Sequence, residues 1–201
     1  ASLKRLRQDT VYGLLIHHGT DVLLPGGECL IDTLVALRDA GLVRKIGVSI
    51  YTADELDGIL DVFVPEIVQL PLSVADQRLL RSGHLAKLKK LGVEIHVRSV
   101  FLQGLLIAAP EALPDFMQPL AQKLAKIEAA SAKAGPLATC LGFASQVPEV
   151  DCVVAGAATA DEWRGIRSAF EQSQEIEMDF ADLAIDDPEI LHPGNWPKQI
   201  G

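Results

Sequence analysis

Apolar residues recur along this chain in two alternating spacings, which predict the order of its structural elements. Short apolar runs typical of buried strands occur at Val11–Ile16, Lys45–Ser49, Glu66–Pro71, Val93–Val97 and Val150–Ala155. Between and after them lie segments with helical spacing, at 28–40, 53–62, 82–91, 116–134, 136–147 and 160–172. Strands that alternate with helices predict a parallel α/β sheet with right-handed crossovers.

Two predicted helices have a capping residue at their N-terminal end. Thr52 stands before the segment 53–62, and Glu55 follows it at the spacing of a capping box. Thr159 is expected to be the N-cap of the segment 160–172.

Helical periodicity also predicts which side chains enter the core. In the segment 28–40, Leu30, Leu34 and Leu37 fall on one face, which we expect to be buried. The C-terminal stretch 180–201 contains one more short helical pattern. We expect residues 1–201 to form a single domain.

Charge and composition exclude several classes of function. The net charge of -9 argues against nucleic acid and anionic membrane surfaces, which require a basic face. No apolar run is long enough to span a bilayer, and the N-terminus has no signal-peptide core. The three cysteines, Cys29, Cys140 and Cys152, are expected to be reduced core thiols in a cytoplasmic protein. Without CxxC, HExxH or an acidic calcium loop, no metal site is predicted.

A pair of histidines follows the first strand directly. The stretch Thr10–Asp21 reads TVYGLLIHHGTD, so His17 and His18 stand where a buried strand ends. Parallel α/β proteins present catalytic groups at the carboxyl ends of their strands. A histidine there can orient a substrate oxygen by donating a hydrogen bond.

Two architectures fit the alternation of strands and helices. One is an open doubly wound sheet, such as a flavodoxin-like domain, and the other is part of a (β/α)8 TIM barrel, which needs eight strands rather than the five counted here. The nucleotide motifs GxGxxG and GxxxxGK[ST] of open sheets do not occur. Because the chain begins with Ala1 inside a helical pattern, we expect further residues upstream.

Five landmarks, in order, resemble the C-terminal portion of the aldo-keto reductase superfamily, from about the fourth barrel strand onward. They read SLKRLRQDTVYGLLIHHGTD, VRKIGVS, EIVQL, VEIHVRSVFLQGLL and VDCVVAGAATADEW. The resemblance implies a (β/α)8 barrel, about five of whose eight units lie in this chain. It also implies hydride transfer between NADP(H) or NAD(H) and a small carbonyl substrate.

The resemblance assigns expected roles to particular residues. His17 falls at the position of the catalytic histidine, and His18 falls at a neighbouring position of variable identity. The positions implied to bind cofactor are Ser49, Gln69, Arg98, Ser99, Val100, Leu102, Gly104, Gly156, Ala157 and Thr159. Within this set, Ser49 and Gln69 would hold the nicotinamide carboxamide, and Arg98 would pack on the nicotinamide ring.

The chain departs from the family pattern at several points. The catalytic Asp, Tyr and Lys of the family belong to the first three units, and no residue here occupies their motifs. Ile50 stands where the family usually has Asn, which removes one carboxamide contact. Glu162 has the wrong charge for a 2′-phosphate, so NADPH is not favoured over NADH.

Two functions from different classes follow from these observations. The first is an NAD(P)-dependent aldo-keto reductase that reduces an aldehyde or ketone to an alcohol. The alternative is a non-catalytic half-barrel that binds nucleotide weakly or pairs with a partner through its open sheet edges. If the half-barrel is the whole chain, an oligomer is expected.

Overall fold

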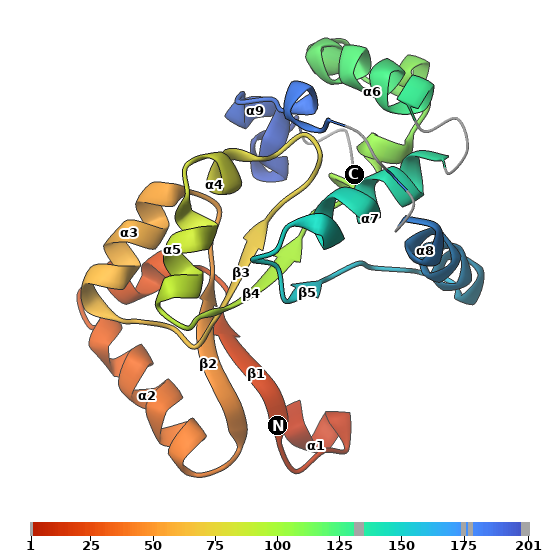
Figure 1. Cartoon of the computed structure of the whole chain (residues 1–201). Coiled ribbons are helices and arrows are strands. Elements are labelled where there is room, and N and C mark those ends of the chain that lie inside the picture. The colour runs from red at the N-terminus through yellow and green to blue at the C-terminus, as the bar shows by residue number, and fades with distance from the viewer. Residues whose placement is uncertain (1, 131–134, 174–175, 177–178, 198–201) are drawn as a thin grey trace. The chain divides into compact units, whose positions relative to one another are not determined.

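The structure is a computed structural model, and it describes residues 2–130, 135–173, 176 and 179–197 (Figure 1). Within these residues the strands form a five-stranded sheet in the order β1-β2-β3-β4-β5. The strands are β1 Val11–Ile16, β2 Val43–Ser49, β3 Ile67–Pro71, β4 Glu94–Arg98 and β5 Cys152–Val153. Sequence order equals sheet order, and β1, β2 and β3 pair in parallel. The predicted parallel α/β architecture, consistent with part of a (β/α)8 barrel, is confirmed.

Helices separate the strands as the periodicity predicted. They are α1 Ser2–Leu6, α2 Gly27–Asp39, α3 Ala53–Val62, α4 Arg78–Arg81, α5 His84–Lys90, α6 Gln118–Ala130, α7 Gly135–Gln146, α8 Ala160–Gln172 and α9 Pro188–Leu191. The sequence did not predict α4, and the last residues of the helix expected at 116–134 lie outside the described part. No helix in the described ranges is both long and apolar enough to cross a membrane.

Three expectations about packing are wrong. The strand expected at Val150–Ala155 is reduced to β5, which is the last strand in the order of the described sheet and has β4 as its neighbour there. Leu30 on α2 is 42% exposed, so the buried stripe of that helix is narrower than its leucines suggested. Of the cysteines only Cys140 is fully buried, whereas Cys29 is exposed.

The chain divides into two compact units, and the first comprises Ala1–Leu70 and Ser82–His96. Here α2, α3 and α5 cover one face of the strands (Figure 1). Leu34 of α2 packs with Val43 and Ile46 of β2 in a buried cluster. Burying such apolar side chains stabilises the unit by about 1.5–3 kcal/mol for each fully buried residue.

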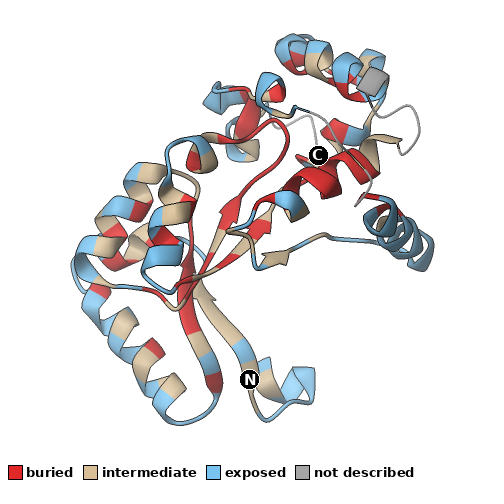
Figure 2. Ribbon diagram, in the orientation of Figure 1, coloured by how far each residue is buried: buried red, intermediate tan, exposed pale blue. Residues whose placement is uncertain are grey.

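The second unit comprises Pro71–Arg81 and Val97–Gly201. Its central element is α7, which is buried without interruption from Ala138 to Ala144 (Figure 2). Ala138 and Leu141 of α7 pack with Ala169 of α8, and small residues there allow the two helices to approach closely. Whether the two units act as one domain stays a prediction.

Candidate functional site

The pairing of β2 with β3 brings two of the predicted cofactor residues together, one at the carboxyl end of β2 and one in the middle of β3. Ser49 and Gln69 are direct partners in the parallel register of these strands. Ser49 is buried and Gln69 is half-buried, while the Ile50 N–H donates to the backbone oxygen of Gln69 at 3.0 Å. A hydroxyl beside a primary amide offers both donors and acceptors, as recognition of a carboxamide requires.

The histidine pair lies at the carboxyl end of β1, in the same unit. The rings of His17 and His18 contact each other edge to face, with centroids 4.7 Å apart, and both residues are exposed. Gly19 follows them, and a Cβ on it would lie 2.7 Å from the backbone oxygen of Ser49. The histidine loop therefore packs directly on the end of β2, and only glycine permits this approach. Sequence reasoning missed Gly19, although a glycine just after the histidines was a readable signal.

The loop after β4, in the second unit, has an unusual backbone. Ser99, Leu102 and Gln103 have φ values of 60°, 43° and 56°, and Gly104 follows with 88°. Non-glycine residues with positive φ are uncommon and cluster at functional sites and ligand clamps. The Arg98 side chain donates from Nη1 to Ser99 Oγ at 3.3 Å. These left-handed residues give the backbone N–H and C=O groups of the loop other directions than they have in a turn of right-handed residues.

Two predicted residues of this loop are buried. Val100 and Leu102 are each only 1% exposed, so their side chains anchor the loop in the core. Any contact that they make with a phosphate must come through the backbone. The sequence could not separate these possibilities, because both residues are apolar and follow a strand.

The loop after β5 places its predicted residues at the surface. Gly156, Ala157 and Thr159 are all exposed. Thr159 Oγ1 accepts a hydrogen bond from Glu162 N at 3.1 Å, which confirms the predicted cap of α8. The Glu162 carboxylate returns the contact by accepting from Ala158 N at 2.7 Å. A negative charge therefore lies against this loop.

A second polar cluster occupies the opposite ends of the strands in the first unit. Tyr12 Oη donates to Glu94 Oε2 at 2.6 Å, Lys45 forms an ion pair with the same oxygen, and His96 Nε2 lies 2.6 Å from Glu94 Oε1. Burial raises the pKa of Glu94, but the hydrogen bonds from Lys45, Tyr12 and His96 outweigh it and lower the pKa to about 2. The hydrogen bond to Glu94 raises the pKa of Tyr12, so this tyrosine is a poor proton donor for catalysis.

This cluster predicts an acid-sensitive contribution to stability. A lowered folded-state pKa stabilises the fold above the ordinary value of 4.5, and the contribution is lost as pH falls towards about 2. We expect Glu94→Gln to lower the free energy of unfolding by about 1–2 kcal/mol at pH 7 and to flatten its decline between these two pH values. Urea titrations across this range test it. An equally steep decline in the variant would contradict the assignment to Glu94.

Parallel strands alternating with helices, with polar groups at the carboxyl ends of those strands, are consistent with part of a (β/α)8 barrel. Comparison with known families gives the particular family. The sequence profile of the aldo/keto reductase family matches residues 1–184, so the chain belongs to this family. The predicted resemblance is thereby confirmed, and family membership supports an oxidoreductase function. A search of curated protein sequences finds no significant match.

Solved structures of the same family share the fold. The aldo-keto reductase AKR11C1 from Bacillus halodurans, in its holo form, aligns with a TM-score of 0.70 at 22% identity, over 87% of this chain and 60% of its own. The glycerol dehydrogenase AKR11B4 from Gluconobacter oxydans aligns with a TM-score of 0.59 at 17% identity, over 89% and 64%. An aldo/keto reductase from Brucella melitensis gives 0.62 at 20% identity, over 90% and 62%. The chain thus spans about three-fifths of the length of these structures.

Proposed function

We propose that this chain provides the substrate-orienting histidine and the nucleotide-holding loops of an NAD(P)H-dependent aldo-keto reductase. The whole protein would reduce an aldehyde or ketone to an alcohol. The observation that carries the proposal is the pairing of Ser49 with Gln69 on the adjacent strands β2 and β3, within a chain of this family. A reduced nicotinamide would supply the hydride.

The residues of the chain divide the work as follows. The His17 ring donates a hydrogen bond to the substrate carbonyl and orients it, while Ser49 and Gln69 hold the carboxamide. Arg98 offers a planar cation for stacking on the nicotinamide ring. The backbone of residues 99–104, with its left-handed positions, fits a pyrophosphate as a turned loop rich in N–H groups.

Cofactor selection would depend on the loop after β5. Gly156, Ala157 and Thr159 are exposed there, and the Glu162 carboxylate lies beside them. Because a carboxylate repels a 2′-phosphate, we propose that NADH binds at least as tightly as NADPH.

The proton must come from elsewhere. In the family the acidic tyrosine and its lysine and aspartate partners belong to the first three barrel units, which the resemblance places before this segment. Tyr12 does not replace that tyrosine, because it is bound to Glu94 at the other end of the strands. We therefore propose that a tyrosine outside residues 1–201 protonates the substrate oxygen.

One set of measurements tests the proposal. The intact mass of the natural protein is compared with the 21.6 kDa of this chain, and the protein is then titrated with NADH and NADPH and assayed with a panel of aldehydes and ketones. We expect a larger mass, saturable nucleotide binding and carbonyl-dependent nucleotide oxidation. A protein that neither binds nucleotide nor oxidises it with any carbonyl would refute the proposal.

The alternative is a non-catalytic half-barrel that binds a partner. It is favoured by an open apolar hollow of about 720 Å³ beside β5, where Trp163 and Phe170 of α8 are 55% and 43% exposed. Exposed apolar surface of this kind marks interaction sites. A natural mass equal to that of this chain, with nucleotide binding and no turnover, would favour this second function.

A further inference from the structure

The loop between β3 and α4 is buried along its whole length, from Leu72 to Gln77. Buried loops are unusual because their polar groups need partners away from water. Hydrogen bonds within the loop and with Arg78 supply some of these partners. Ser73 N donates to Asp76 O at 3.1 Å and Ser73 Oγ accepts from Asp76 N at 2.9 Å. The Asp76 carboxylate accepts two hydrogen bonds from the Arg78 guanidinium, each of 2.8 Å.

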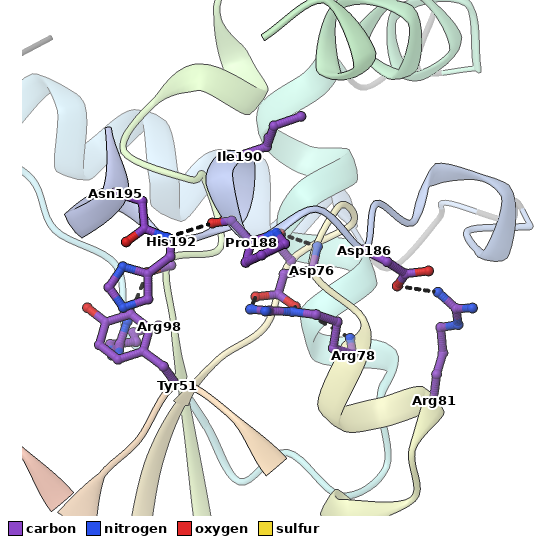
Figure 3. Close-up of polar contacts among 12 residues, drawn as sticks. Tyr51, Asp76, Arg78, Arg81, Arg98, Asp186, Pro188, Ile190, His192 and Asn195 are labelled. Carbon is purple, nitrogen blue, oxygen red and sulfur yellow. Dashed lines mark hydrogen bonds and ion pairs between the residues drawn. The ribbon is translucent and has the colours of Figure 1, made fainter. Parts of the chain in front are cut away.

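The C-terminal segment 180–191 supplies further partners. Ile185 N donates to Ala75 O at 2.9 Å, and Arg81 forms an ion pair with Asp186 at 2.8 Å (Figure 3). The segment itself is anchored, since Ile185, Ile190 and Leu191 are buried. Two stretches about a hundred residues apart in sequence are therefore joined inside the second unit.

Gln77 is the side chain that joins them most directly. It is only 4% exposed, and its Nε2 donates to Val74 O at 2.8 Å and to Phe180 O at 2.7 Å. Both protons of the amide are thus used, one within the loop and one towards the C-terminal segment. No apolar residue could satisfy these two carbonyls.

The same loop also contacts the backbone of a predicted cofactor residue. Leu72 N donates to Arg98 O at 3.1 Å. Arg98 ends β4 and is followed by the left-handed positions Ser99 and Leu102. Hydrogen bonds therefore join Phe180 to Gln77 and Gln77 to Val74. The backbone of the loop connects Val74 to Leu72, whose N–H reaches Arg98, the residue before the left-handed positions.

We propose that Gln77 is a positioning residue, which ties the C-terminal segment to the β3–α4 loop and thereby fixes the backbone of Arg98 for nucleotide binding. Its effect on nucleotide binding rests on the proposed function, whereas the coupling within the unit does not. Gln77 has no contact with a ligand in this scheme. It acts through the Leu72–Arg98 hydrogen bond.

The test uses Gln77→Leu, which keeps the volume and removes both donors. The control is Gln146→Leu, because Gln146 Nε2 also donates to a backbone oxygen of the same unit, that of Ile176 at 2.9 Å, away from the loop. A second variant, Asp186→Asn, weakens the exposed ion pair with Arg81 and should fold normally. The readouts are amide hydrogen exchange of Leu72 and Ile185, the dissociation constant for NADH, and the melting temperature.

We expect Gln77→Leu to speed exchange at both amides about tenfold and to weaken NADH binding about as much. Asp186→Asn should speed exchange at Ile185 by about twofold. Gln146→Leu should leave the exchange of Leu72 and Ile185 and the dissociation constant for NADH unchanged. Unaltered exchange at Leu72 in Gln77→Leu, or equal acceleration in Gln146→Leu, would overturn the coupling. If the natural protein binds no nucleotide, the proposed function fails, and the exchange data alone decide the coupling.

Discussion

Replacement of Gly47 by alanine is expected to destabilise the first unit strongly. Gly47 lies opposite Ile67 in the parallel register of β2 and β3. A Cβ on Gly47 would lie 1.8 Å from the backbone oxygen of Ile67, and 2.8 Å from its Cγ2. Neither strand can move away, because β2 pairs with β1 on its other side and β3 has β4 on its other side. Overpacking in cores costs about 1–3 kcal/mol and more where backbone must move, so we expect a loss of at least about 3 kcal/mol.

The matched control is Gly13→Ala on the neighbouring strand. A Cβ there would lie 3.5 Å from Ile67 Cδ1, which is an ordinary contact with the same residue. Circular dichroism and urea unfolding of both variants measure the difference. A folded Gly47→Ala protein with the stability of Gly13→Ala would show that the two strands do not approach as closely as the structure has them.

Local sequence signals predicted much of this fold. Thr52 accepts a hydrogen bond from Glu55 N at 3.2 Å, as the spacing indicated, and the bounds predicted for α3 are those observed. Such caps depend on residues three positions apart, so one sequence is enough to find them. β1 was equally readable, because an apolar run stops abruptly at His17.

Features that depend on neighbours distant in sequence could not be read in this way. The need for glycine at position 47 arises from Ile67 on another strand, and that at position 19 arises from Ser49. The Glu94 cluster joins residues of β1, β2 and β4, although β3 lies between β2 and β4 in the sheet. Adjacent strands lie about 4.8 Å apart, so a flat sheet would keep Tyr12 far from Glu94. Only the curvature of the sheet brings them together, and a linear pattern does not encode curvature.

The candidate site also combines features that the sequence could predict with features that depend on distant residues. The family resemblance supplied the predicted cofactor positions, whereas the histidine pair was also visible from its place after an apolar strand. The register of β2 with β3 independently pairs two of the cofactor positions, Ser49 and Gln69. The resemblance did not distinguish side chains that can face a ligand from those that hold the loop, as the buried side chains of Val100 and Leu102 illustrate. Burial decides that question, and burial depends on the whole second unit.

In the whole protein, His17→Ala is expected to lower kcat/KM for carbonyl reduction about 100-fold. A positioned hydrogen-bond donor at a developing oxyanion typically contributes a factor of about 10²–10³. His17 is exposed at the end of β1, so its removal leaves no buried group unpaired and the fold should persist. Steady-state kinetics with a fixed aldehyde, together with the melting temperature, measure the effect.

His18→Ala is the matched control, because the two rings are adjacent and equally placed in the loop, with centroids 4.7 Å apart. We expect this variant to retain activity within about threefold, since His18 has no assigned contact with the carbonyl. The dissociation constant for the nucleotide should be unchanged in both variants, because the proposed role of His17 concerns the substrate alone.

Equal losses of kcat/KM in the two variants would mean that the loop requires both rings for its conformation, and would remove His17 from the catalytic role. A loss of nucleotide affinity in His17→Ala alone would instead place His17 among the groups that bind the cofactor.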